Sequence, residues 1–569
     1  MRLLPLVLLL PLLSCTKDEP AEDELFTGEG WPLGEVVAVE GRGLRATLDT
    51  AQGPLMVVRL AGTHEEMGRQ LGVLVGPEVD RVWRSLTASM GDDLGMSQEA
   101  VEAMYGPLLD TVWAHMVPQV PAPWLAYIDA ADEAMGGDEV CTLCRVTALS
   151  NISDMNFDSM SAALATIDAG RSAQLQAFYA EGPDAASALG AEPPAVPGPF
   201  ATCSFFAAWG ARSADGHLYA SRNLDWSADT GISAAKALMV YVPEGAGAGH
   251  PFATIGYAGM PGALAGLSAS GVAVAEVGST SVLERIAAEP WIFRHMEILE
   301  HAEDLDQAIA YHTLEVGDGF LRPQSNGYNF MVAWGDPVGG GAGAEAAVIE
   351  ANGAMVSVHR GGETTVHLFA EDGSPDQVLT GVSANREADA VEVDRFGAAR
   401  GFACGEGGAP LLDERGLPTE QEGGCPLPTG LPLEQAIFRG DEAMSHWNRR
   451  FQMASHGPQS GDGLMITSGS YTERYLRSHL LLQAWEQGVE FARDGQIIVA
   501  AAPPVGVGMD QAELLASQVA RDDNILSVVY DATALDLRVS YEQGTGDSWV
   551  PANALPYFPL SLAPAFAYE

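Results

Sequence analysis

Basic residues are scarce in this chain, and their scarcity excludes whole classes of ligand. The 569 residues include 29 Lys and Arg against 76 Asp and Glu, which gives a formal net charge of −47. So large an acidic excess repels the phosphates of nucleic acids and the head groups of anionic lipids, so we expect neither as a ligand. The excess is typical of a solvated surface that keeps an exported protein soluble.

Motifs for nucleotides and metals are also missing. Neither a GxxxxGK[ST] phosphate loop nor an HExxH pair occurs in the sequence. These motifs carry phosphate binding and zinc binding through fixed spacings of donor groups. We therefore expect no metal and no other cofactor.

An apolar run occurs at the N-terminus, and no later uninterrupted apolar run in the sequence is long enough to span a bilayer. Residues 3–13 are too short a run to cross a bilayer and indicate an export signal. The following LLSC at 12–15 resembles a bacterial lipoprotein cleavage box, which implies a signal peptide at 1–14 and a lipidated Cys15. Thr16 after that cysteine favours the outer membrane. We expect an exported protein that is held on the bacterial cell envelope by this lipid alone; an ordinary secretory signal with a chance cysteine is the alternative.

Cysteines number only six, and their positions suggest different roles. Cys404 and Cys425 bracket a stretch rich in Gly, Pro and Glu, and we expect a disulfide that closes this surface loop. Cys141 and Cys144 form a C-x-x-C without a second pair or a His cluster, so a local disulfide or two core thiols are favoured over a zinc or redox site. Cys203 is then left over, which makes it a candidate reactive thiol.

The chain changes character along its length. Residues 15–30 are expected to form a tether, residues 31–60 short strands, and the region to about 179 mainly helices that begin at a capping box, Thr63 to Glu66. A proline-rich linker at 180–200 precedes a region of strands and glycine turns. We interpret 31–202 as a mainly helical pro-segment and 203–569 as the catalytic domain.

Strands dominate the second region and few helices accompany them. This segregation predicts an α+β layered domain. Strands are expected at 237–242, 252–256, 262–278, 329–334, 347–351, 355–359, 364–368, 497–501, 525–530 and 536–541, and helices at 282–302 (with a break at Pro290), 305–313 and 471–492.

A predicted β-hairpin carries the most informative residues. An apolar run from Thr202 to Gly210 and a second run from Ser221 to Trp226 flank a turn at 214–216. This arrangement returns Arg222 and Asp225 to the neighbourhood of Cys203. A thiol in a hydrophobic core rarely needs charged neighbours, whereas a nucleophilic cysteine needs them.

The chemistry of such a site requires a base for the thiol. The twelve histidines are scattered and none lies in a motif that announces a Cys–His pair. If the chain cuts itself between Thr202 and Cys203, the new α-amino group, with a pKa near ~7.7–8.0, is itself a suitable base. Arg222 would then supply positive charge beside the thiolate, and Asp225 would hold the α-ammonium. Taken singly, each of these two residues also fits a structural salt bridge.

The segment from Thr202 to Trp226, with its R-N-x-D element, resembles the nucleophile hairpin of the isopenicillin-N acyltransferase-like family of N-terminal-nucleophile hydrolases. The same element recurs in choloylglycine hydrolases and acid ceramidases. Weaker similarities follow in the same order along most of the chain from about 31 to 565. They lie at 62–68, 259–262, 266–271, 328–330, 349–350, 445–450 and 524–531.

The resemblance implies a four-layer αββα sandwich and an inactive precursor that cleaves itself into a small and a large chain, which stay associated. It also implies amide hydrolysis or acyl transfer through a thioester on Cys203. Asn329 matches a side chain that helps to form the oxyanion hole, where one donor contributes about 2.7–4 kcal/mol. Arg449, or its neighbour Arg450, matches an arginine near the nucleophile. Asn326 and Asn385 are alternatives that fit turn or cap roles better.

The chain departs from the family pattern in three ways. Thr202 stands where Gly is often found, which is expected to slow or prevent self-cleavage. Glu276 to Gly278 occupies the region where some relatives carry a second oxyanion asparagine. Residues 401–432 resemble an insertion.

Taken together, these residues favour a tethered hydrolase or acyltransferase acting on a small N-acyl or lipid-like amide. Hydrolysis is favoured over transfer because water is abundant outside the cell. A phospholipase-B-like acyl ester hydrolase is the enzymatic alternative. A non-catalytic surface binding protein is the alternative from another class.

Overall fold

The computed structural model describes the chain in several stretches. These are residues 33–137, 140–152, 202–226, 230–279, 281, 286–313, 327–353, 355–360, 363–369, 375–380, 392–393, 399–402, 425–426, 435–440, 478, 481–482, 485, 491–493, 496–499 and 506–566. Several expectations lie outside these residues, and they concern the signal peptide, the tether, the linker at 180–200, Cys15, Asn326, Asn385, Cys404, Arg449 and Arg450.

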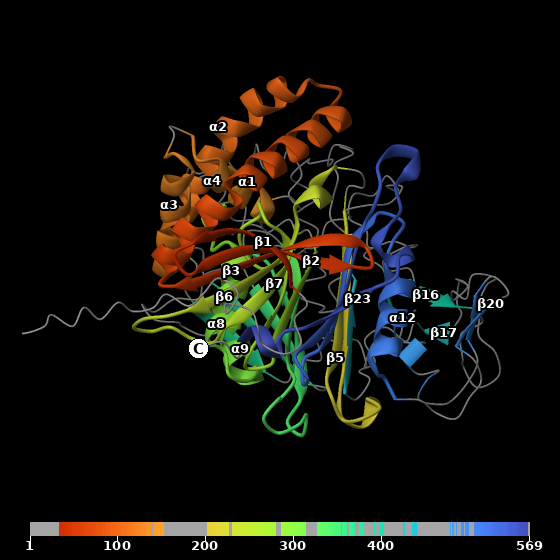
Figure 1. The fold of residues 1–569 in the computed structure, drawn as a ribbon. Coiled ribbons are helices and arrows are strands. Elements are labelled where there is room, and N and C mark those ends of the chain that lie inside the picture. Colours follow the sequence, from red (N-terminus) through yellow and green to blue (C-terminus); the bar gives the residue numbers. More distant parts are fainter. Residues whose placement is uncertain are drawn as a thin grey trace, which may run out of the picture.

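Two β-sheets pack face to face in the described part of the chain, and helices cover both outer faces (Figure 1). The larger sheet has the order β1 (Leu33–Glu40), β2 (Gly43–Thr50), β3 (Gly53–Gly62), β6 (Lys236–Pro243), β7 (Phe252–Tyr257), β8 (Ala265–Ser268), β9 (Val272–Gly278), β10 (Tyr328–Trp334), β11 (Glu345–Ala351), β12 (Met355–Arg360), β13 (Glu363–Phe369) and β14 (Pro375–Thr380). The smaller has the order β18 (Ala436–Arg439), β4 (Thr202–Ala208), β5 (Tyr219–Asp225), β21 (Asn524–Asp531), β22 (Asp536–Tyr541) and β23 (Phe558–Ser561).

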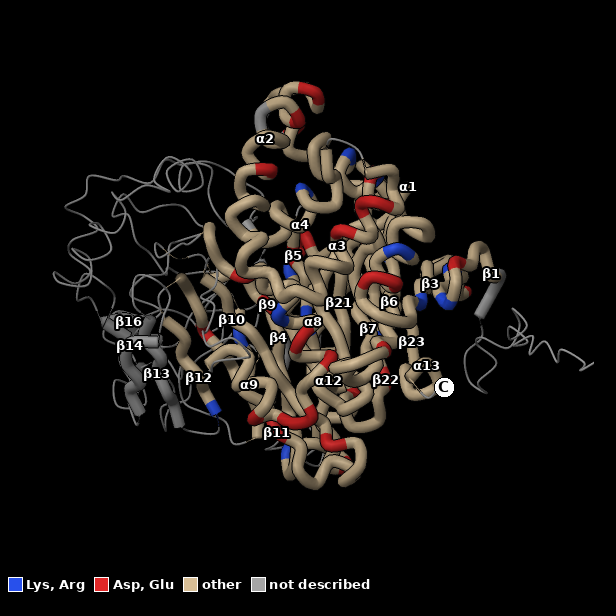
Figure 2. The backbone as a smooth tube through the Cα atoms, turned by 90° about the vertical axis from the view of Figure 1, so that its left-hand side faces the viewer, with Lys and Arg blue, Asp and Glu red and all other residues tan. Residues whose placement is uncertain are grey.

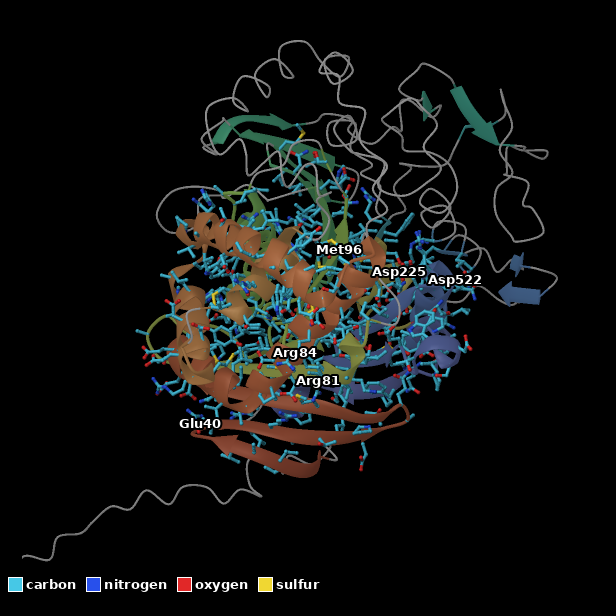
Figure 3. The ribbon with its side chains drawn as sticks, turned by 90° about the horizontal axis from the view of Figure 1, so that it is seen from above. Glu40, Arg81, Arg84, Met96, Asp225 and Asp522 are labelled. Atoms are coloured by element: carbon cyan, nitrogen blue, oxygen red, sulfur yellow. A yellow bond between two sulfur atoms is a disulfide. The ribbon has the colours of Figure 1, made fainter. Side chains whose placement is uncertain are left out.

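The helices form two unequal outer layers. The larger sheet is covered by α1 (His64–Leu94), α2 (Gln98–Met116), α3 (Ala122–Met135), α4 (Thr142–Ile152), α8 (Trp291–His301) and α9 (Leu305–Thr313), and the smaller sheet by α12 (Met509–Val519). Figure 3 shows the first layer from above, with Arg81 and Arg84 on α1 and Glu40 at the end of β1. The α+β prediction is confirmed, and the layer order is αββα.

The remaining elements are short. They comprise β15 (Glu392–Val393), β16 (Ala399–Phe402), β17 (Cys425–Pro426), β19 (Phe491–Arg493), β20 (Gln496–Val499), α13 (Ala563–Phe566) and the 3₁₀ turns η2 (Val117–Gln119), η3 (Gly210–Arg212), η4 (Ile232–Ala235), η5 (Gly546–Ser548) and η6 (Ala552–Ala554). Among the described helices, none is both long and apolar enough to span a membrane.

Strand β4 shows how the sequence specifies the layers. Cys203, Phe205 and Ala207 face the core between the two sheets, whereas Phe206 and Ala208 face the core under α12. A strand that is buried on both faces has no polar alternation, so it appears in the sequence as one continuous apolar run. The run from Cys203 to Trp209 therefore marks the middle of the sandwich.

The N-terminal segment contributes strands as well as helices. Strands β1, β2 and β3 extend the larger sheet, and β3 pairs with β6 in the parallel sense, with Met56 opposite Ala237. Helix α1 then begins at the predicted capping box, where the Glu66 backbone N–H donates to Thr63 Oγ1 and the Thr63 N–H donates to Glu66 Oε2. Strands from before residue 202 and strands from after it thus share one continuous sheet.

Most of the predicted elements are observed, with some differences. Residues 262–278 form two strands, β8 and β9. In the helix expected at 282–302, α8 begins at Trp291, directly after the predicted break at Pro290, and the described residues 286–290 are not helical, because proline disfavours helix at the residue before it. The expected helix at 471–492 falls mostly outside the described residues. Helix α12 was missed, although its buried residues 512, 515, 516 and 519 repeat at helical spacing.

Many charged residues lie on the outer elements of the fold. Figure 2 shows acidic positions along the outer helices and the connecting loops, with basic positions scattered between them. Cys141 and Cys144 form a disulfide at the start of α4. The C-x-x-C is therefore a local staple, one of the two roles expected for it.

Candidate active site

The predicted hairpin is the centre of the smaller sheet. Strands β4 and β5 pair antiparallel, with Thr202 opposite Asp225, Cys203 opposite Leu224, and Phe205 opposite Arg222. This register places the two charged residues of β5 beside the first residues of β4. The hairpin prediction, including the approach of Arg222 and Asp225 to Cys203, is confirmed.

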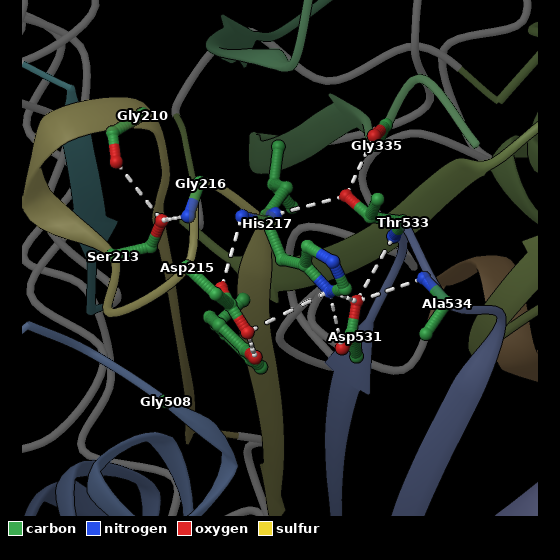
Figure 4. Close-up of polar contacts among 12 residues, drawn as sticks. Gly210, Ser213, Asp215, Gly216, His217, Gly335, Gly508, Asp531, Thr533 and Ala534 are labelled. Carbon is green, nitrogen blue, oxygen red and sulfur yellow. Dashed lines mark hydrogen bonds and ion pairs between the residues drawn. The ribbon is translucent and has the colours of Figure 1, made fainter. Parts of the chain in front are cut away.

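The closed end of the hairpin is held by its own polar groups (Figure 4). Ser213 Oγ donates to the Gly210 carbonyl at 2.9 Å and accepts from the Gly216 N–H at 2.9 Å. His217 Nδ1 lies 2.9 Å from Oδ2 of Asp531, the last residue of β21. These contacts stabilise the closed end of the hairpin. The candidate site lies at its open end.

Cys203 is the free cysteine among the described residues. Its side chain is fully buried in the uncut chain, and its Sγ lies 3.7 Å from Arg222 Nη2. A guanidinium at this distance stabilises the thiolate relative to the thiol, because the ion pair forms in a medium of low polarity. The sulfur therefore has a cation beside it, which is one of the features that a nucleophilic cysteine requires.

Arg222 is shared between the thiol and a carboxylate. The same Nη2 lies 3.3 Å from Glu276 Oε2 on β9, so this arginine bridges the two sheets. Burial alone would lower the pKa of Arg222, but Cys203, Glu276 and Tyr530 raise it above its ordinary value. The guanidinium therefore keeps its charge although the side chain has no exposure to solvent.

Asp225 lies at the open end of the hairpin. Its side chain is fully buried, it stands opposite Thr202 in the ladder, and its Oδ1 accepts from Asn524 Nδ2 at 2.8 Å. The loop before β21 closes over this end, with the Trp226 N–H donating to the Asp523 carbonyl; Figure 3 marks Asp225 beside Asp522 of the same loop. Asp225 thus stands opposite the residue that precedes Cys203.

Asn329 comes to the same place from the larger sheet. It is the second residue of β10, is fully buried, and donates from Nδ2 to the Gly440 carbonyl at 3.1 Å. Gly440 directly follows β18, which pairs with β4, and Arg439 stands opposite Phe205. Cys203, Arg222, Asp225 and Asn329 therefore converge at one end of the two sheets.

Three further charged residues at this end were missed as site residues. Glu276 pairs with Arg222 as described, and Arg439 Nε donates to Glu350 Oε1 at 2.9 Å with both side chains almost fully buried. Glu350 stands opposite Asn329 on the neighbouring strand. Each of the three is a charge with apolar neighbours in a mainly apolar strand, VAVAEVG, AIFR or EAAVIEA, and that contrast was the available signal.

A metal centre is not formed by the residues that the structure describes. Among them, no group of three or more His, Cys, Asp or Glu side chains is arranged to hold a metal ion. The chemistry available to the described site is therefore that of a thiol, two buried Arg–Glu pairs, a carboxylate and an amide.

Comparisons with known proteins give distant structural similarities. No protein-family model and no curated protein matches the chain. Three similar solved structures are the Caenorhabditis elegans ortholog of N-acylethanolamine-hydrolyzing acid amidase (11% identity, 58% of this chain and 93% of that chain, TM-score 0.29), a mutant of conjugated bile acid hydrolase from Clostridium perfringens (10%, 62% and 93%, 0.30) and penicillin V acylase from Agrobacterium tumefaciens (9%, 60% and 83%, 0.26). At these identities and TM-scores, the interpretation of the site depends on its own residues.

Proposed function

We propose that the protein is a self-cleaving cysteine hydrolase that acts on an N-acyl amide, in the isopenicillin-N acyltransferase-like branch of the N-terminal-nucleophile hydrolases. The observation that carries the proposal is the open end of the hairpin. Cys203 Sγ lies 3.7 Å from the Arg222 guanidinium, and Asp225 stands opposite Thr202 across the bond to be cut. The resemblance of the sequence in this hairpin supports the same assignment.

The first reaction is cleavage of the chain itself. Cys203 Sγ attacks the carbonyl carbon of Thr202, a C–S bond forms, the C–N bond breaks, and the thiol proton passes to the leaving nitrogen. Water then hydrolyses the thioester, which frees the Thr202 carboxylate, the thiol and the Cys203 α-amine. The Asp225 carboxylate, opposite Thr202, stabilises the positive charge that develops on that nitrogen.

Turnover of substrate uses the groups that cleavage creates. The neutral α-amine takes the thiol proton, Sγ attacks the substrate carbonyl, and the amine leaving group receives the proton as the acyl-thioester forms. Water releases the acid and restores the thiol. Arg222 stabilises the thiolate, and Asn329 Nδ2 donates to the oxyanion of the tetrahedral intermediate.

Burial of the thiol fits an inactive precursor. Cys203 is fully buried in the uncut chain, so a substrate reaches the sulfur only after the residues around it have moved. The two products of cleavage would stay together, because β3 of the small chain remains paired with β6 of the large chain along seven residue pairs, from Met56–Ala237 to Gly62–Pro243.

The proposal also includes the cellular location of the protein. We place the enzyme outside the cell, attached to the envelope by lipid on Cys15 after removal of residues 1–14. Water is the abundant acyl acceptor there, so hydrolysis is the expected outcome of the thioester.

Intact-mass measurement of purified protein tests the cleavage. We expect a break before Cys203 in the parent chain and an unbroken chain in Cys203→Ala. Labelling of the cleaved protein by iodoacetamide, followed by loss of activity, assigns the thiol as the nucleophile. A parent chain that stays uncut and is not labelled by iodoacetamide would instead indicate a binding protein.

A substrate panel then tests the reaction class. N-acyl amino acids, N-acyl amines, β-lactams and phospholipids should be separated by their rates, with the amides hydrolysed fastest. Turnover of phospholipid esters alone would assign the chain as an acyl ester hydrolase.

A further inference from the structure

A buried asparagine outside the nucleophile hairpin contacts the Asp225 carboxylate. Asn524 is the first residue of β21, and its Nδ2 lies 2.8 Å from Asp225 Oδ1, 3.2 Å from the Leu224 carbonyl and 3.1 Å from the Leu526 carbonyl. Asn524 and Asp225 are both fully buried. A buried carboxylate needs donors to remain charged, and this amide nitrogen supplies one.

The backbone is shaped to bring this side chain to the carboxylate. The register between β21 and β5 shifts between Asn524 and Leu526, so Ile525 is an extra residue in the ladder. A bulge of this kind re-aims a neighbouring side chain. The Ile525 carbonyl accepts from the Glu542 N–H at 3.0 Å, so the bulge leaves this polar group satisfied.

A second set of hydrogen bonds fixes the orientation of the amide. Ser527 Oγ lies 2.9 Å from Asn524 Oδ1 and 2.7 Å from Asn223 Oδ1, and its hydroxyl hydrogen serves one of the two oxygens at a time. Asn223 Nδ2 donates to Ser204 Oγ and to the Ala516 carbonyl, each at 2.9 Å. The oxygen of the Asn524 amide is thus held toward a hydroxyl and its nitrogen toward the carboxylate.

The network joins both strands of the hairpin. It runs from Asp225 through Asn524, Ser527 and Asn223 to Ser204, the residue after the nucleophile, and its members are buried. Side chains of β21 therefore hold Asp225, at the end of β5, in a fixed position relative to the start of β4.

We propose that Asn524 is a positioning residue for the reaction at Cys203. Its amide holds the Asp225 carboxylate, ionised and correctly aimed, beside the bond between Thr202 and Cys203. The inference rests on the proposed function, because Asp225 matters there only if the nitrogen of Cys203 becomes an ammonium group.

Two substitutions separate positioning from simple stability. Asn524→Ala removes the donor without adding charge. Asn524→Asp keeps the shape but places a second carboxyl within hydrogen-bond distance of Asp225, and two such groups share one proton because both cannot easily ionise together. The acid form of the pair therefore persists to higher pH than the single acid in the parent.

The test follows self-cleavage of the full chain over time after cell-free synthesis, by intact mass, between pH 5 and 9. We expect cleavage at neutral pH to slow by about 10–100-fold in both variants, because a small misplacement of a reacting group has effects of this size. Only in Asn524→Asp should the rate gain a new rise with pH.

A matched control is Asn553→Asp in η6. This asparagine donates from Nδ2 to the Ser517 carbonyl on α12. Its turn η6 contacts β21, the strand of Asn524, but its side chain bonds to the outer helix instead of the hairpin. We expect Asn553→Asp to cleave at the parent rate with the parent pH profile.

The outcomes separate the inference from the proposed function. An uncut parent chain overturns both. A parent that is cut, with Asn524 variants that follow its rate and pH profile, overturns the positioning role alone. Loss of the folded state in both Asn524 variants, measured by thermal unfolding, also overturns it, because Asn524 would then serve stability only.

Discussion

Arg222 and Cys203 approach each other to 3.7 Å across two paired strands, between Nη2 and Sγ, and both are fully buried. The same guanidinium nitrogen lies 3.3 Å from Glu276 Oε2. One buried cation therefore serves a nucleophile from the smaller sheet and a carboxylate from the larger one. The stability of the sandwich and the reactivity of its thiol are coupled through this residue.

Removal of the guanidinium should affect both properties. In Arg222→Met we expect a loss of about 3–5 kcal/mol in the free energy of unfolding, because the buried Glu276 carboxylate loses its ion pair with the guanidinium. The double variant Arg222→Met with Glu276→Gln should recover most of this loss and still alkylate slowly with iodoacetamide. Denaturant unfolding and alkylation rates measure the two effects. Parent-like alkylation in the double variant would contradict the role of the cation.

Asn329 should contribute to the rate far more than to stability. In Asn329→Ala we expect turnover to fall by about 10²–10³-fold, because one preorganised oxyanion donor is lost. Steady-state kinetics on the best amide of the substrate panel measure this. The control is Asn352→Ala in the turn after β11, where the side chain accepts from the Met355 N–H and lies outside the hairpin. Equal effects of the two substitutions would argue against an oxyanion role.

The turn contact of His217 should make stability depend on pH. Burial alone would lower the pKa of His217, but the hydrogen bond to Asp531 and the charges of Asp531, Asp215 and Asp536 raise it overall. A raised folded-state pKa means that the stabilisation is fully present below the unfolded value of about 6.5 and is lost as pH rises through the folded value.

The matched variant is His217→Gln. We expect the melting temperature of the parent to exceed that of the variant at pH 5 and the difference to shrink by pH 9. A difference that stays constant over this range would show that the charge of His217 is not involved.

His295 should act in the opposite direction. Burial, together with Arg222 and Arg294, lowers the pKa of His295 to about 3, although its hydrogen bond to the Ala263 carbonyl opposes this. As pH falls, His295 takes up a proton near pH ~6.5 in the unfolded chain, but in the folded chain only near its lowered pKa. Between these two pKa values the free energy of unfolding therefore falls with pH, by about 1.4 kcal/mol per pH unit. In His295→Gln, denaturant unfolding should show a shallower loss of stability below pH 6. An unchanged slope would contradict the prediction.

Gly68 should be intolerant of any side chain. A Cβ at this position would lie 2.1 Å from the Tyr127 carbonyl oxygen, where α1 packs against α3. We expect Gly68→Ala to lower the free energy of unfolding by about 1–3 kcal/mol or more, because the two helices must move apart. Gly76→Ala on the same helix is the control, since its Cβ would meet only the Met135 side chain, at 3.2 Å. A stable Gly68→Ala protein would contradict the close contact.

Local signals in the sequence predicted the elements of the site well. The capping box at Thr63 and Glu66 and the hairpin from Thr202 to Asp225 are both confirmed, because each depends on contacts between residues that are close in the chain. The C-x-x-C staple is also local. Asn329 was reached through resemblance, and its strand was predicted from its apolar residues.

Long-range partners could not be predicted in the same way. Glu276, Glu350 and Arg439 appear in the sequence as charges among apolar neighbours, and no nearby residue indicates their partners. The pairs Arg222–Glu276 and Arg439–Glu350 form only when the two sheets stack, because each pair joins one residue from the smaller sheet to one from the larger. Asn524 and Asp225 meet only after β21 has paired beside β5.

The order of residues along the chain thus determined the hairpin, the caps and the alternation of buried faces, since these follow from backbone geometry over a few residues. The tertiary structure decided which buried charges meet and how the Asp225 carboxylate is held. The physical reason is that a charge in the interior requires a partner, and the partner is supplied by whichever strand the packing of the two sheets brings opposite it.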